Sequence, residues 1–176
     1  MPNNTTIAII GVAGKKEVSI AKLFAAKYHV LLFDHNEDKL SKACHQITLP
    51  GKSANAEMMH CPTDASWEAD VILLLGYTDP DQFISKKIDR VATQKIVVVF
   101  VNETYNDSFK AIEFTWRQLL PYSKLITVSG VDFMAESELS KQLIMESNDE
   151  DALKEGAVLF ASVGFNIQIL FTPLIH

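Results

Sequence analysis

Short apolar runs alternate with amphipathic stretches along the chain. Residues 7–10 (IAII) and His29–Phe33 (HVLLF) are too short for helices and almost wholly apolar. Such runs are typical of strands that are buried on both faces of a parallel sheet. The same reasoning predicts further strands near residues 58–61 and over residues 70–75, 95–101, 125–128, 142–145 and 167–171.

Helices are predicted between these strands from helical spacing and from capping residues. Asn36, Asp79 and Asn148 are predicted N-caps, because a short polar side chain accepts a hydrogen bond from the first helical turn. Gly164 is predicted to end the last helix in the left-handed conformation. Helices are therefore expected over residues 18–25 and 36–45, from residue 79, over residues 108–120 up to Pro121, and from residue 149.

Alternating strands and helices with buried strands predict an α/β fold with a doubly wound, mostly parallel sheet. The 176 residues contain no repeat, linker or low-complexity stretch, so a single domain over residues 1–176 is expected. Trp67 and Trp116 fall in predicted helices, where packing roles are expected.

Composition narrows the function classes. The chain is 48% hydrophobic and 22% charged, as in globular proteins, and its net charge of −6 is unlike that of a nucleic-acid binder. No apolar run approaches the roughly 20 residues of a membrane helix, and the first residues do not resemble a signal peptide. Cys44 and Cys61 form no metal or disulfide pattern, so we expect a cytoplasmic protein without a metal site.

The turn after the first predicted strand carries the main chemical signal. It reads GVAGKKE from Gly11 to Glu17. In a dinucleotide fold, glycines here permit the tight turn and the approach of a pyrophosphate, which binds at the helix N-terminus. The third glycine of a GxxGxxG pattern is replaced by Glu17. The residues of this turn predicted to bind the cofactor are Gly11, Val12, Ala13, Gly14, Lys15 and Lys16.

Asp34 stands at the end of the second predicted strand, where a carboxylate bonds the adenosine ribose hydroxyls. Its charge would repel a 2′-phosphate and no arginine follows it, so NAD is predicted rather than NADP. His35 is predicted either to lie against the adenine or to be exposed. The alternative interpretation is that Gly11 and Gly14 only form a turn and that Asp34 only ends a strand.

Glu17 allows two interpretations. A carboxylate is favourable in the first turn of a helix, because it complements the helix dipole. The same charge would repel a pyrophosphate, and Lys15 and Lys16 either offset that repulsion or pair with Glu17.

The order of elements resembles the deazaflavin-coenzyme-dependent NADP oxidoreductases and the N-terminal domain of pyrroline-5-carboxylate reductases. The resemblance rests on IAIIGVAGKKEVSIAKLFAAKYHVLLFD, EADVILLLGYTDPDQF, KIVVVFVNET, RQLLPYSKLITVSGVDF and ESNDEDALKEGAVLFASVGFNIQIL. It implies an NAD(P)-binding Rossmann-like fold and hydride transfer between a nicotinamide and a bound redox partner. It also implies that the loops at Gly76, Tyr77 and Asn102 border the nicotinamide.

These observations predict an NAD(P)-binding oxidoreductase with an unknown small-molecule redox partner and no identifiable catalytic residue. The cofactor carries the hydride chemistry, so the lack of a catalytic motif does not argue against an enzyme. The alternative is a non-enzymatic dinucleotide sensor, or a degenerate scaffold that acts through a protein partner. Neither nucleic acid nor a membrane is expected as a partner. A homodimer is expected, because one domain leaves no second domain to close a site.

Overall fold

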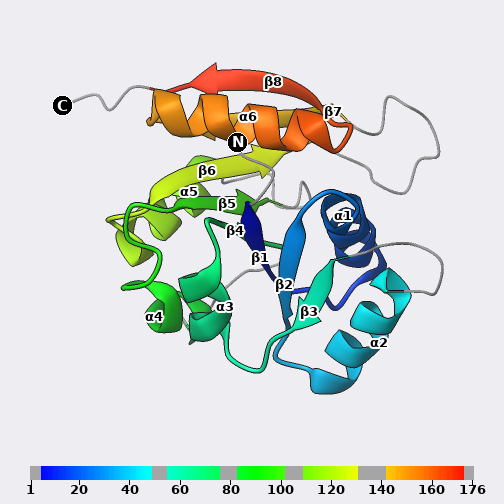
Figure 1. Ribbon diagram of the computed structural model, residues 1–176. Helices are drawn as coiled ribbons and strands as arrows, with labels where there is room; N and C mark the ends of the chain where they lie inside the picture. Colours follow the sequence, from blue (N-terminus) through cyan, green and yellow to red (C-terminus); the bar gives the residue numbers. More distant parts are fainter. Residues whose placement is uncertain (1–4, 49–54, 76–82, 102–108, 131–141, 173–176) are drawn as a thin grey trace.

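A computed structural model describes residues 5–48, 55–75, 83–101, 109–130 and 142–172, and its strands form one eight-stranded sheet (Figure 1). The order across the sheet is β3-β2-β1-β4-β5-β6-β7-β8. The strands are β1 Thr6–Ile10, β2 His29–Phe33, β3 Ala56–Met58, β4 Val71–Leu74, β5 Ile96–Phe100, β6 Lys124–Ser129, β7 Gln142–Ser147 and β8 Asn166–Phe171.

All neighbouring strands are parallel except β6 and β7, so the predicted doubly wound, mostly parallel α/β sheet is confirmed. From β1 the chain moves outward through β2 to β3, and it then returns to β4 on the other side of β1. The boundary between β1 and β4 is therefore the topological switch point, beside which doubly wound sheets bind their ligands.

Helices cover both faces of the sheet (Figure 1). Helices α1, α2 and α6 contribute to one buried apolar cluster, and α3, α4 and α5 contribute to the other. No described helix is long and apolar enough to cross a membrane. The helices are α1 Lys15–Ala25, α2 Glu37–Ile47, α3 Pro62–Glu68, α4 Phe83–Ile88, α5 Phe109–Leu119 and α6 Glu150–Ser162.

Helices α1 and α6 are joined by aromatic and polar contacts. The rings of Phe24 and Phe160 meet edge to face, with centroids 5.0 Å apart. The Tyr28 hydroxyl lies 2.7 Å from Ser162 Oγ, 134 residues further along the chain. Helix α1 is thus held in place partly by α6, far along the chain.

Most predicted boundaries agree with the structure, including two caps. Asn36 Oδ1 accepts a hydrogen bond from the Lys39 N–H at 3.0 Å and caps α2. Gly164 follows α6 with a φ of 97°, in the left-handed region that glycine adopts without a Cβ clash. Trp116 is buried, as expected. The predicted starts of helices at Asp79 and at residue 108 lie outside the described residues.

Three predictions were wrong. The third strand is Ala56–Met58 rather than residues 58–61, because Pro62 already begins α3 and Cys61 is its N-cap. Trp67 is 70% exposed, since it lies on the outer face of the short helix α3.

The N-cap of α6 is Asp149 and not Asn148, because Asp149 Oδ1 accepts from the Ala152 N–H at 2.9 Å. The hydroxyl of Ser147 accepts from the Asp149 N–H and so holds the chain in its entry into the helix.

The two candidate caps can be separated by substitution. Asp149→Ala should lower the free energy of unfolding by about 1 kcal/mol, because it removes the hydrogen bond to the first turn and a favourable charge. Asn148→Ala should change it by less than about 0.5 kcal/mol. Urea denaturation of both variants checks the difference, and equal effects would contradict the assignment of Asp149.

Candidate functional site

The turn between β1 and α1 lies at the switch point of the sheet. Gly11 has a φ of 91°, a left-handed conformation that disfavours residues with a Cβ. Its N–H donates to the Phe33 carbonyl at 2.9 Å, so the start of the turn lies against the end of β2. This hydrogen bond brings the glycine turn next to Asp34, the residue that follows Phe33.

The N-terminus of α1 begins at Gly14, which has no side-chain cap. A Cβ on Gly14 would lie only 2.0 Å from Glu17 Oε2, so the carboxylate of Glu17 folds back over the glycine. In this position the carboxylate is close to the positive end of the helix dipole. The space that a glycine leaves for an approaching anion is thus filled by an anion of the chain itself.

Asp34 is fixed at the end of β2 by its neighbours. Its side chain is only 2% exposed, and Oδ1 accepts a hydrogen bond from the Asn36 N–H at 2.9 Å. Asn36 in turn caps α2, so two consecutive side-chain caps shape the β2–α2 turn. A ribose hydroxyl reaches this carboxylate only if the atoms that cover it move.

The other predicted cofactor-binding residues differ in exposure. His35 has a 66% exposed side chain, with Nδ1 3.4 Å from Asp34 Oδ1. Val12 is completely buried and packs in the core, so only its backbone faces the turn. Ala13 and Lys16 are half-buried, and Lys15 is exposed. Gly76, Tyr77 and Asn102 lie outside the described residues.

Other chemistry is limited in the described part of the chain. It contains no group of three or more His, Cys, Asp or Glu side chains that could hold a metal ion. Both cysteines are free thiols. Burial raises the pKa of Cys44, which makes this thiol a poorer nucleophile at neutral pH.

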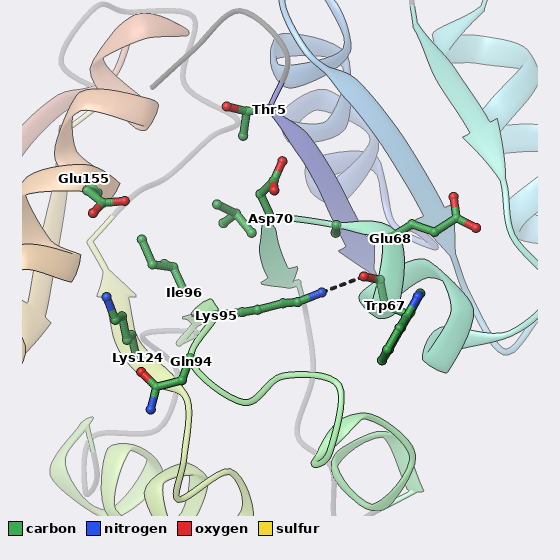
Figure 2. A pocket seen from close by; sticks show the side chains of 11 residues that line it. Thr5, Trp67, Glu68, Asp70, Gln94, Lys95, Ile96, Lys124 and Glu155 are labelled. Atoms are coloured by element: carbon green, nitrogen blue, oxygen red, sulfur yellow. Dashed lines mark hydrogen bonds between the residues drawn. The ribbon is translucent and has the colours of Figure 1, made fainter.

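A cavity of about 490 Å³ lies at the opposite end of the strands from the Gly11–Gly14 turn, where β1, β4, β5 and β6 begin (Figure 2). No motif in the sequence indicated this cavity, because the starts of strands carry none. Five charged residues line it: Glu68, Asp70, Lys95, Lys124 and Glu155.

The central charges of this cavity are engaged within the protein. Lys95 Nζ donates to the carbonyls of Ser66 and Trp67, both at 2.7 Å, and thereby caps the C-terminal end of α3. Figure 2 shows the bond to Trp67. Asp70 Oδ2 accepts from the Thr6 N–H at 2.8 Å. Burial lowers the pKa of Lys95, and the Asp70 charge opposes part of that shift. These contacts join α3 to the sheet, which is a structural role.

Comparison with solved structures confirms the fold suggested by the sequence resemblance. An imine reductase variant from Myxococcus stipitatus with NAD+ has a TM-score of 0.71 and 12% identity, over 97% of this chain and 55% of the other. The imine reductase of the same organism with NADP+ gives 0.70 and 15%, over 94% and 55%. A protein from Arthrobacter sp. FB24, assigned as an F420-dependent NADP reductase, gives 0.70 and 18%, over 96% and 85%.

These likenesses establish a Rossmann-like fold of the kind found in NAD(P)-dependent reductases. The chain spans about half the length of the imine reductases that it matches. No family model and no curated protein matches it by sequence.

The lowered pKa of Lys95 predicts the direction in which protein stability changes with pH. Its folded-state pKa lies below the ordinary value of 10.5, so between the two values the unfolded chain binds more protons. The stability of the wild type relative to Lys95→Met should therefore rise as the pH rises through the folded-state pKa. Urea denaturation of both proteins at neutral and alkaline pH measures this slope.

Lys154 provides a matched control with the opposite sign. Lys154 Nζ donates a hydrogen bond to Glu150 Oε1 at 2.9 Å, and this bond raises the pKa of Lys154. The stability of the wild type relative to Lys154→Met should therefore fall as the pH rises through the alkaline range. Slopes of the same sign for the two lysines would contradict the assignment.

Proposed function

We propose that this protein binds a nicotinamide dinucleotide at the switch point and acts as an oxidoreductase, with NAD preferred to NADP. One observation carries the proposal. The Gly11–Gly14 turn lies beside Asp34, and both are at the carboxyl end of adjacent parallel strands, β1 and β2. This is the position where Rossmann-like sheets take the phosphates and the adenosine ribose of a dinucleotide. The structural neighbours with bound NAD+ and NADP+ support the same ligand class.

In this proposal each element has a separate task. The N–H groups in the first turn of α1, which have no side-chain cap, would receive the pyrophosphate. Asp34, oriented by the Asn36 N–H, would accept hydrogen bonds from the ribose hydroxyls. The loops at Gly76, Tyr77 and Asn102 would border the nicotinamide. The bound cofactor would supply the hydride chemistry.

Whether these residues leave room for the pyrophosphate of a dinucleotide depends on the position of Glu17. The carboxylate over Gly14 stands where a phosphate would approach, so the site accepts an anion there. Glu17 must rotate away before a pyrophosphate enters. It is only half-buried and lies at a helix start, so rotation costs little more than the dipole interaction, about 0.3–1 kcal/mol. The residues therefore fit the cofactor with Glu17 displaced.

The same observation favours a second candidate. If Glu17 keeps its place, the protein is a degenerate scaffold or a sensor that binds dinucleotide only weakly. The two candidates differ in affinity, so a binding measurement separates them.

Titration of the purified protein with NADH and NADPH, followed by nicotinamide fluorescence, tests the proposal. NADH is expected to bind at least about tenfold more tightly, because the Asp34 carboxylate repels a 2′-phosphate; tenfold corresponds to about 1.4 kcal/mol. Asp34→Asn should reduce this ratio, whereas Asp151→Asn, on the exposed first turn of α6, should leave it unchanged. Absence of binding by either nucleotide would overturn the oxidoreductase proposal.

The role of Glu17 is tested by removing its charge and keeping its size. Glu17→Gln should strengthen NADH binding by up to about tenfold, because the repulsion of the pyrophosphate disappears. Isothermal titration calorimetry gives the affinities. Glu155→Gln on α6 is the control and should not change them. Equal affinity of Glu17→Gln and wild type would mean that the Glu17 carboxylate does not compete with the phosphates.

A further inference from the structure

The strand β8 forms one edge of the described sheet (Figure 1). Among the described strands it pairs only with β7, and α6 packs against it. The Thr172 N–H, directly after the strand, donates to the Ser147 carbonyl of β7 at 3.0 Å. Backbone groups alternate in direction along a strand. The N–H and C=O groups of Ile169 and Phe171 therefore point away from β7, to the side on which no described strand pairs with β8.

The end of β8 exposes three consecutive large apolar side chains. Ile169 is 46% exposed, Leu170 is 42% exposed and Phe171 is 50% exposed. Successive side chains of a strand point to opposite faces of the sheet, so these three residues place apolar surface on both faces beside the edge. Consecutive exposed apolar residues of this kind are uncommon unless a partner covers them.

The two edges of the sheet differ in their protection. Edge strands in monomers are normally short, charged or interrupted by proline, which prevents pairing with other chains. At the other edge, β3 has three residues and carries the exposed Glu57. The six residues of β8 read NIQILF and include no charged residue, proline or glycine. This edge lacks the features that prevent strand pairing.

We propose that β8 pairs antiparallel with β8 of a second copy of the chain, around a two-fold axis at Leu170. Ile169 would then lie opposite the partner's Phe171, an aromatic and β-branched pair of the kind that stabilises cross-strand contacts. The pairing extends the sheet across both copies and covers the three apolar residues. It is independent of cofactor binding and gives the expected homodimer a defined surface.

The lack of charge on β8 allows a second copy as the occupant. Each chain has a net charge of −6, so two copies repel each other wherever charged surfaces meet. A contact through β8 buries no ionisable group of this strand. A two-fold contact also requires a surface that is complementary to itself. An uncharged edge strand meets this requirement, because its outward N–H and C=O groups can bond those of an antiparallel copy.

The outward direction of the Ile169 N–H allows a selective test. Ile169→Pro removes a donor that the β7 ladder does not use, so the fold should be retained while pairing with a second copy is lost. Ile169→Lys should also weaken pairing, because it replaces the apolar contact with the partner's Phe171 and places two like charges diagonally across the axis on one face of the sheet. Phe114→Lys is the matched control, since Phe114 is 62% exposed on α5 and takes no part in the proposed contact.

Sedimentation equilibrium without nucleotide measures the result. Wild type and Phe114→Lys should have twice the 19.6 kDa of one chain. Ile169→Pro and Ile169→Lys should dissociate at least about tenfold more readily, with an unchanged circular dichroism spectrum. In wild type, the amides of Ile169 and Phe171 should exchange slowly, and in Ile169→Lys the Phe171 amide should exchange fast. A monomeric wild type, or a dimer that both Ile169 variants retain, would overturn the proposal.

Discussion

The architecture depends on the burial of β1 and β4 side by side. Every side chain from Ile7 to Ile10 and from Val71 to Leu74 is at most 1% exposed. A strand that is buried on both faces needs a layer of helices on each side, and a parallel neighbour needs a crossover connection to supply them. The crossovers that follow β1 and β4 run to opposite sides of this boundary, from β1 to β2 and from β4 to β5. In doubly wound sheets such a reversal places the ligand crevice at the carboxyl ends of the strands, where the Gly11–Gly14 turn lies.

Local signals in the sequence were sufficient to predict most of the fold. Buried strands such as β5 have strongly β-branched sequences, and the Asn36 cap and Gly164 follow from the properties of single residues. The errors arose where neighbours decide the outcome. Two adjacent polar residues, Asn148 and Asp149, both suit an N-cap, and the hydrogen bond from the Asp149 N–H to Ser147 Oγ selects the second. The sequence pattern alone does not distinguish Asn148 from Asp149 as the N-cap of α6.

The candidate site was predicted less completely than the fold. Gly11, Gly14 and Asp34 were predicted at the ends of two neighbouring strands, and the structure places them there, because few residue types suit a tight turn at the end of a strand. The burial of Asp34 and the position of the Glu17 carboxylate over Gly14 depend on side-chain conformation, which spacing does not reveal. The sequence indicated that Glu17 was exceptional, and the structure shows its carboxylate folded over Gly14. The cavity around Lys95 had no signal, because its residues come from five separate segments.

The contact between α1 and α6 has a consequence for the order of folding. Helix α1, whose N-terminus forms the candidate phosphate turn, packs through Phe24 against Phe160, and Tyr28, just beyond the helix, contacts Ser162. Contacts between residues so distant in sequence form late, because closing a long loop is entropically unfavourable. During synthesis on the ribosome, α1 therefore lacks part of its packing until α6 has emerged. The Gly11–Gly14 turn therefore reaches its final form only after α6 has been made.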